Sequence, residues 1–293
     1  PWSNAAISGW ILDPDRKKMS KSKGNVVTPS DLLDEHGSDA VRYWAASARL
    51  GTDAAFDTGQ MKIGRRLAIK ILNAAKFALS FEVPAGHTEV TESVDQAMLL
   101  ALADVVRDAT AAFENYDHTK ALELSEKFFW NFTDDYLELV KERAYGQGGA
   151  TTATQASAAL ALRKALHVML RLFAPFLPYA TEEVWGWWQK DAGSIHRSAW
   201  PTVDELTHGL DAANHGLMEL ASVALFGLRK AKSDAKASMK AEVVSATLQA
   251  PAAVLTSVRV FESDLKAVGR IAELTYAEAA EVAVTDVVLE VAS

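Results

Sequence analysis

The 293-residue sequence predicts a mainly α fold, in which an antiparallel helical bundle lies between a short N-terminal part and a small α/β domain. Three observations support this prediction. Apolar residues recur at helical spacing through long segments between residues 58 and 190. Prolines and glycines mark the ends of these segments. After about residue 240, apolar and polar residues begin to alternate as they do in strands.

The N-terminal part is expected to contain one strand and two short helices. Residues 5–13 are typical of a strand. The first helix would have Thr28 as its N-cap and Pro29 at its first position, and it would end at Gly37. A second short helix would follow directly and end at Gly51.

The bundle is expected to consist of five helices, the last of which begins in a proline-containing turn. The predicted ranges are 58–81, 93–116, 117–146, 156–173 and 174–190. The third range carries a run of large aromatic side chains, which are costly to expose to water and are therefore expected in the core. These residues are Phe128, Phe129, Trp130 and Phe132.

The last part of the chain is expected to form the α/β domain. Helical segments are predicted at 218–234 and 251–269, and strands at 241–250, 271–278 and 281–292. In the first strand, Val244, Ala246 and Leu248 would share one face. The resulting domain ranges are 1–57, 58–210 and 211–293.

Composition excludes several classes of protein. Hydrophobic residues make up 49% of the chain, which suffices for a core and argues against disorder. Cysteine is absent, so disulfides and thiolate chemistry are excluded, and a reducing cytoplasm is favoured. No apolar run approaches the roughly 20 residues of a membrane helix. The net charge of −8 argues against a globally basic nucleic-acid binder, so RNA would have to bind at local basic surfaces.

The segment DPDRKKMSKSKGN, residues 13–25, concentrates four lysines in one short loop. A solvated turn does not need such a density of ammonium groups, whereas a site for concentrated negative charge does. The alternative interpretation is a basic turn on the surface. We name residues 13–25 the lysine loop.

The KMSKS sequence at residues 18–22 is the signature of class I aminoacyl-tRNA synthetases, and the chain resembles the valyl branch of that family. The resemblance extends through GTDAAFD at 51–57, FFWNFTDDYLELVKERAYG and LFAPFLPYATEEVW. It implies that residues 1–57 end a catalytic domain and that the bundle binds a tRNA anticodon. The implied reaction activates valine with ATP and attaches it to tRNA(Val).

The resemblance also implies roles for the residues of the lysine loop. Lys18 and Lys21 would be catalytic and would contact the ATP phosphates, Met19 would lie near the adenine, and Ser20 and Ser22 would donate further hydrogen bonds. Negative charge builds up on the α-phosphate and the departing pyrophosphate, and mobile ammonium groups can stabilise it. Mg²⁺ would accompany ATP in the full-length enzyme. No metal ligand is predicted here, because the seven histidines are dispersed.

The family's other ATP motif, H-I-G-H, is absent from this sequence, as are the nucleotide-binding sheet, the amino-acid pocket and the editing domain. The sequence, which begins without methionine, is therefore interpreted as the C-terminal portion of a longer synthetase. Its partners would include the N-terminal catalytic and editing domains of the same polypeptide. The fragment alone is not expected to activate valine.

Two basic segments are candidates for tRNA binding. Residues 58–81 contain five basic residues and no Asp or Glu, and several of them share a helix face that could contact phosphates. Phe77 is a candidate for stacking on a base. The alternative is a solvated face with Phe77 in the core. The candidate tRNA contacts of both segments are Lys62, Arg65, Arg66, Lys70, Lys76, Phe77, Arg229, Lys230 and Lys232.

Three other interpretations stay open. The chain could be the same part of an isoleucyl or methionyl enzyme, since nothing in it lines the amino-acid pocket. It could be a stand-alone tRNA-binding module without catalytic activity. It could also be a helical scaffold for protein partners, although that interpretation leaves the lysine loop unexplained.

Overall fold

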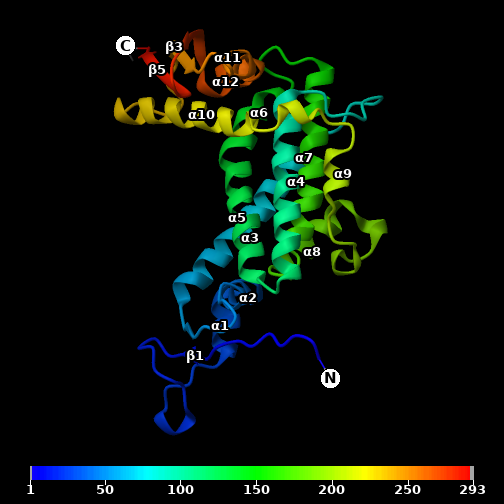
Figure 1. The fold of residues 1–293 in the computed structure, drawn as a ribbon, viewed down its shortest axis with the longest axis vertical. Coiled ribbons are helices and arrows are strands. Elements are labelled where there is room, and N and C mark those ends of the chain that lie inside the picture. Colours follow the sequence, from blue (N-terminus) through cyan, green and yellow to red (C-terminus); the bar gives the residue numbers. More distant parts are fainter. Residues whose placement is uncertain (1, 291–293) are drawn as a thin grey trace. The chain divides into compact units, whose positions relative to one another are not determined.

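The structure of the protein is a computed structural model that describes residues 2–290 (Figure 1). The chain divides into two compact units. The first comprises the residues up to Phe77 with 105–127 and 166–203, and the second comprises 78–104, 128–165 and the residues from Asp204 onward. Helices make up most of both units, so the predicted mainly α fold is confirmed. The domain boundaries at residues 57 and 210 stay predictions.

A two-stranded parallel sheet belongs to the first unit. It pairs β1 (Ile11–Leu12) with β2 (Ala54–Ala55), and α1 (Pro29–His36) and α2 (Ser38–Ala46) lie between them in sequence. The predicted strand over residues 5–13 was too long, because only Ile11 and Leu12 belong to a strand. The partner segment turns at Gly51, where φ is 75°, so it offers few extended residues for pairing.

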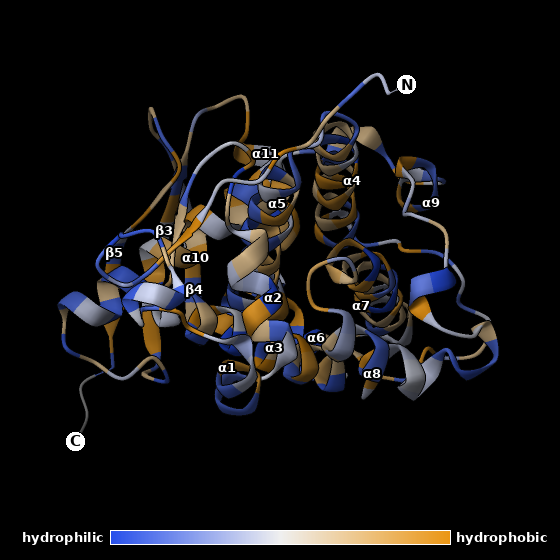
Figure 2. Cartoon of the chain, turned by 90° about the horizontal axis from the view of Figure 1, so that it is seen from below, coloured by the Kyte–Doolittle hydropathy of each residue, from blue (hydrophilic) through white to orange (hydrophobic). Residues whose placement is uncertain are grey.

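The helices of the predicted bundle begin and end close to the expected residues. They are α3 (Thr58–Leu79), α4 (Ser93–Glu114), α5 (His118–Asn131), α6 (Leu137–Ala144), α7 (Thr152–Phe173) and α8 (Pro178–Trp188). Each turn of α4 contains both hydrophobic and hydrophilic residues (Figure 2). Such a pattern gives a helix one apolar face to bury.

One wider turn interrupts the predicted helix over residues 117–146. Phe132–Tyr136 form a π-helical turn between α5 and α6. On the neighbouring α10 (Leu217–Asp234), Arg229 donates a hydrogen bond to the Asp135 carboxylate at 2.7 Å and another to the main-chain oxygen of Asp134. Single π turns are rare in proteins, and this one is bonded from a neighbouring helix by the arginine.

The aromatic run before and within this turn is only partly in the core. Phe129 and Phe132 are buried, as expected. Phe128 and Trp130 are half-buried, which corrects their assignment to the core. Successive residues of a helix point in directions about 100° apart, so four residues in such a short run cannot all face the same side.

The C-terminal part contains a three-stranded sheet with strand order β4-β3-β5. In it β3 (Val243–Ala250) runs parallel to β4 (Ile271–Glu278) and antiparallel to β5 (Ala283–Leu289). Between β3 and β4 the chain forms α11 (Leu255–Val258) and α12 (Glu262–Gly269). A short α9 (Val203–Thr207) precedes α10. The predicted strand over 281–292 extends to residues 291–292, which lie outside the described residues.

The prediction that Val244 lies on the buried face of β3 was wrong. Ala246 and Leu248 are buried as expected, but Val244 is 49% exposed and Val243 is buried in its place. The pairing of β3 with β5 shifts register between Val243 and Ser245. An irregularity of this kind reverses which face each side chain takes, and periodicity alone cannot reveal it.

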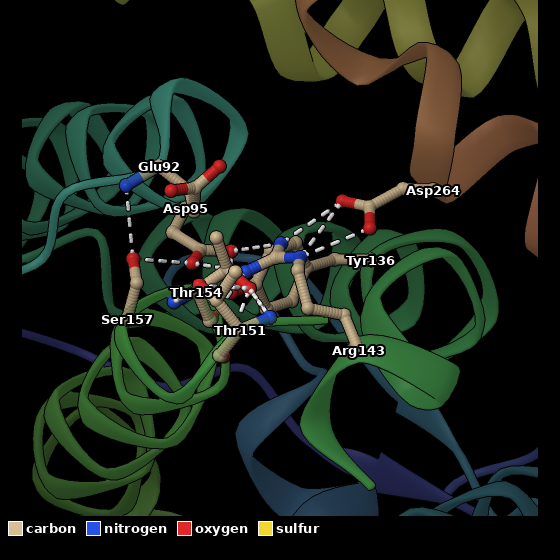
Figure 3. Close-up of polar contacts among 8 residues, drawn as sticks. All are labelled: Glu92, Asp95, Tyr136, Arg143, Thr151, Thr154, Ser157 and Asp264. Atoms are coloured by element: carbon tan, nitrogen blue, oxygen red, sulfur yellow. Dashed lines mark hydrogen bonds and ion pairs between the residues drawn. The ribbon is translucent and has the colours of Figure 1, made fainter. Parts of the chain in front are cut away.

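A buried ion network joins four helices of the second unit (Figure 3). Arg143 of α6 lies between the carboxylates of Asp95 in α4 and Asp264 in α12. Its Nη1 and Nη2 each donate a hydrogen bond to Asp95 at 2.8 Å, while Nε and Nη2 each donate one to Asp264 at 2.9 Å. Nη1 also donates to the main-chain oxygen of Thr154 in α7 at 3.0 Å. Every nitrogen of the guanidinium group is therefore hydrogen-bonded.

Two hydroxyl groups complete the surroundings of Asp95, which is fully buried. The Tyr136 hydroxyl donates to it at 2.8 Å and the Ser157 hydroxyl at 2.7 Å (Figure 3). Burial raises the pKa of the nearby carboxyl groups of Asp264 and Glu92. Buried charges are tolerated when they are paired and hydrogen-bonded, so this network fixes α12 to α4 and α6.

Candidate functional site

The lysine loop projects beyond β1 (Figure 1). It begins at Asp13, directly after β1, and Lys18 forms an antiparallel bridge with Leu12. Lys21–Lys23 form a 3-10 turn that ends at Gly24, where φ is 67°. This left-handed conformation is readily adopted by glycine because it lacks a Cβ atom. The loop therefore has a defined local structure rather than an arbitrary surface course.

The two lysines assigned to the ATP phosphates have different surroundings. The Lys18 Nζ atom lies 4.2 Å from the centroid of the Trp10 ring, which is a cation–π contact. The Lys21 side chain is exposed and, among residues 2–290, makes neither a hydrogen bond nor an ion pair. Lys18 is thus held at the base of the loop, whereas Lys21 is free to move.

The other predicted nucleotide-binding residues contact each other. The hydroxyl oxygens of Ser20 and Ser22 lie 2.9 Å apart, and Ser20 Oγ accepts a hydrogen bond from the main-chain N–H of Lys23 at 3.3 Å. Met19 and Ser20 are half-buried, and Ser22 is exposed. Ser20 therefore serves first as the N-cap of the 3-10 turn. Its role toward a nucleotide stays a prediction.

Two residues that the motif does not include hold the loop together. Asp13 Oδ1 accepts the main-chain N–H of Lys17 at 2.7 Å, and Asp13 Oδ2 accepts the side-chain amide of Asn25 at 2.7 Å. Asn25 Oδ1 accepts the main-chain N–H of Ser20 at 2.9 Å, and its Nδ2 also donates to the main-chain oxygen of Lys18 at 3.2 Å. Asp and Asn at the ends of a loop are typical of such side-chain to backbone bonds, which was an available signal.

The basic residues of α3 lie in the first unit and are mostly accessible. Lys62, Arg65, Arg66 and Lys76 are exposed, whereas Lys70 and Phe77 are half-buried. Arg65 Nη1 donates a hydrogen bond to the main-chain oxygen of Glu35 at 2.9 Å, at the end of α1. Lys76 Nζ lies 5.9 Å from the ring centroid of Trp187 in α8. The contact of these residues with tRNA stays a prediction.

The second basic segment lies on α10, and the structure engages its members within the protein. Arg229 is bonded to the π turn, as described above, and Lys230 forms an exposed ion pair with Asp234 at 2.8 Å. A phosphate that approaches either cationic group would have to compete with these partners. Exposed pairs of this kind contribute little free energy, so the exchange at Lys230 costs little.

The prediction that Lys232 contacts tRNA was wrong, because the structure buries this residue. Its side chain is only 2% exposed. The ammonium group donates to the main-chain oxygens of Met239 at 3.1 Å, Ala241 at 2.8 Å and Gly269 at 2.9 Å, and burial lowers its pKa. All three donors of the group are used, so Lys232 stabilises the C-terminal part rather than binding an external phosphate.

Comparison with known families decides the affiliation of the chain. The family model of the anticodon-binding domain of tRNA ligases matches residues 95–248. The chain belongs to this family. In this member of the anticodon-binding domain family, residues 1–57 also match the model of class I tRNA synthetases (I, L, M and V).

Curated valine–tRNA ligases are similar to this anticodon-binding family member over almost its whole length. The ligase of Leifsonia xyli subsp. xyli is 57% identical over 99% of the chain and 33% of the relative. That of Salinispora arenicola is 56% identical over 95% of the chain and 34% of the relative. That of Thermobifida fusca is 57% identical over 94% and 31%. The chain thus spans about a third of the length of these relatives, and the resemblance to the valyl branch is confirmed.

A separate property concerns membranes. Within the described part of the chain, residues 2–290, no helix combines the length and the apolar character that crossing a bilayer requires.

Proposed function

We propose that the chain is part of a valine–tRNA ligase, which activates valine with ATP and attaches it to tRNA(Val). It would supply the phosphate-binding lysine loop and the surface that binds the tRNA anticodon. The observation that carries this proposal is the 57% identity to a valine–tRNA ligase over 99% of the chain, with KMSKS intact at residues 18–22. The isoleucyl and methionyl alternatives are less favoured, because the similar ligases described above all carry valine in their names.

The proposed chemistry uses the lysine loop during the first step. The valine carboxylate attacks the α-phosphate of ATP, a new P–O bond forms, and the bond to pyrophosphate breaks. Negative charge increases on the departing pyrophosphate, where preorganised cationic donors stabilise the transition state most effectively. Lys21, with its free ammonium group, is suited to follow this charge, while Lys18 would approach from the base of the loop.

Magnesium belongs to the proposed reaction as a companion of ATP, but the lysine loop does not fit a site for it. Mg²⁺ prefers carboxylate and phosphate oxygens. Asp13 already uses both carboxylate oxygens within the loop, and Asp15 lies 3.5 Å from the Lys17 ammonium group. The remaining side chains from Lys17 to Lys23 are cationic, hydroxyl or thioether groups. No step proposed for the loop depends on a metal that these residues hold.

The proposed tRNA surface is the exposed face of α3. Lys62 and Arg66 lie four residues apart, so they are neighbours on one side of the helix. Both are exposed, and no Asp or Glu occurs within α3. An uninterrupted cationic face of this kind binds the phosphates of a nucleic acid without reading its sequence. Recognition of the anticodon bases would need additional contacts.

The experiment that tests the tRNA part of this proposal compares tRNA(Val) with tRNA(Ile). Binding of the chain to both is measured at two salt concentrations, with wild-type and altered anticodons. We expect the chain to prefer tRNA(Val) and to lose this preference when the anticodon is changed. The reason is that contacts to bases distinguish one nucleic-acid sequence from another, whereas contacts to phosphates do not. Equal, purely salt-dependent binding of all tRNAs would contradict anticodon recognition by these residues.

Charge reversal on α3 tests the phosphate contacts directly. Lys62→Glu combined with Arg66→Glu should weaken tRNA binding and reduce the slope of log K against log salt by about two, since each lost phosphate contact removes close to one unit. The matched control is Lys120→Glu with Lys127→Glu, which makes the same charge change at exposed positions of α5. If both double variants change affinity and slope equally, only net charge is being measured and α3 is not the contact surface.

A further inference from the structure

We propose that Asp13 and Asn25 are positioning residues of the lysine loop. They clasp its two ends, so that the ammonium groups of Lys18 and Lys21 reach the nucleotide from one preformed turn. The pair is named the Asp13–Asn25 clasp. The inference rests on the proposed ligase function, because it assigns the clasp to the ATP-dependent step of that reaction.

The first observation is the reach of the Asn25 side chain. Its amide group makes hydrogen bonds to Asp13 at 2.7 Å, Ser20 at 2.9 Å and Lys18 at 3.2 Å. One side chain therefore connects the beginning, the middle and the end of the loop. The bonds to Lys18 and Ser20 are to main-chain atoms, so they fix the backbone on both sides of Met19 without using the side chains of the motif.

The second observation is how Asp13 uses its charge. Asp13 is only 6% exposed as a residue. Its two carboxylate oxygens accept the main-chain N–H of Lys17 and the amide of Asn25, and these bonds, in that order, lower its pKa. The Lys17 side chain instead has its ammonium group 3.5 Å from Asp15. Asp13 thus organises the backbone of the loop rather than neutralising a lysine.

These bonds have a consequence for catalysis. An unstructured loop would have to be ordered each time it closes on ATP, which costs conformational entropy. The clasp holds the loop in shape beforehand, so closure needs only movement of a preformed turn. A displacement of reacting groups by about 1 Å can reduce a rate about 100-fold, so the clasp should influence the rate although it touches no substrate.

The test uses two variants of the full-length enzyme in valine-dependent ATP–pyrophosphate exchange. Asn25→Asp keeps the shape of the side chain but places a second carboxylate against Asp13 and removes the donors to Asp13 and Lys18. The exchanged pair, Asp13→Asn with Asn25→Asp, restores one donor and one acceptor between positions 13 and 25. It also keeps acceptors for the main-chain N–H groups of Lys17 and Ser20. Only the bond to the Lys18 oxygen stays absent.

We expect Asn25→Asp to lower kcat/KM for ATP by about 10- to 100-fold at pH 7.5, with KM for valine and tRNA affinity unchanged. Two facing carboxylates share a proton as the pH falls, because one of them is then stabilised as the neutral donor. The variant should therefore regain activity relative to wild type between pH 7.5 and 6. The exchanged pair should recover at least half of the loss, on a logarithmic scale, at pH 7.5.

The outcomes separate the two proposals. An active wild type whose Asn25→Asp variant is equally active overturns the clasp and leaves the ligase function standing. A loss that neither low pH nor the exchanged pair restores also overturns the clasp, because it would reflect unspecific damage to the loop. A full-length wild type without valine-dependent exchange overturns the proposed function and the role of the clasp with it. Unchanged tRNA binding serves as the check that each variant is folded.

Discussion

Replacing Lys21 by alanine in the full-length enzyme is expected to raise the barrier for valine activation by about 2–4 kcal/mol. That corresponds to a rate reduced about 30- to 900-fold. The reason is the ammonium group of this residue, which makes neither a hydrogen bond nor an ion pair among the described residues and can therefore move with the charge of the departing pyrophosphate. Affinity for tRNA should change much less, because the loop is not the proposed tRNA surface.

The measurement is the rate of valine-dependent ATP–pyrophosphate exchange, together with tRNA affinity. The matched control is Lys23→Ala, which removes an equally exposed lysine from the same 3-10 turn but lies outside the five-residue motif. A simple loss of positive charge would slow both variants to the same extent. An exchange rate unchanged by Lys21→Ala would remove this lysine from the catalytic residues.

The second large effect concerns stability. Replacing Arg143 by methionine should lower the free energy of unfolding by about 3–5 kcal/mol, because it leaves Asp95 and Asp264 buried without their counter-ion. Such a loss is a large part of the 5–15 kcal/mol that stabilises a typical domain. Lys141→Met is the control on the same helix, since Lys141 is exposed and forms an exposed ion pair with Glu138 at 3.5 Å.

The deficit of the Arg143→Met variant should depend on pH. Burial already raises the pKa of Asp264, and removing the arginine raises it further. The folded variant then binds protons that the unfolded chain releases, so its stability increases as the pH falls through the raised pKa. Urea unfolding at pH 7.5 and 5.5 should show a smaller difference from wild type at the lower pH. A difference that is small at both pH values would show that the network is not needed for stability.

Much of the helical fold could be predicted because its signals are local. The periodic segment over residues 58–81 corresponds to α3, and the proline at position 29 begins α1 as expected. The strands were harder. Residues 5–13 are apolar enough for a strand, but strand pairing depends on a partner elsewhere in the chain. The register shift beside Val244 is likewise a property of two strands together and is invisible in one of them.

The nucleotide-binding residues could be predicted from the KMSKS motif. The tRNA contacts on α10 were predicted less well, because only the number of basic residues supported them. Lys230 and Lys232 look alike in a charge count, yet two residues along a helix correspond to about 200° of rotation, so they face opposite sides. Leu217, Ala221, Leu225 and Leu228 form the buried stripe of α10, and Lys232 continues that stripe at the next four-residue step. Periodicity could have revealed its burial, whereas its three carbonyl partners come from segments that only folding brings together.

The π turn at Phe132–Tyr136 has a consequence for comparing related sequences. A π turn accommodates one residue more than an α-helical turn, so it rotates everything that follows by about 100°. The side chain of Arg143, seven positions after this turn, reaches Asp95 and Asp264 in that rotated phase. A relative that lacks one residue here would direct the corresponding arginine elsewhere, and its two acids would need another neutralising group. Alignment gaps in this short stretch therefore deserve as much weight as substitutions of the charged residues themselves.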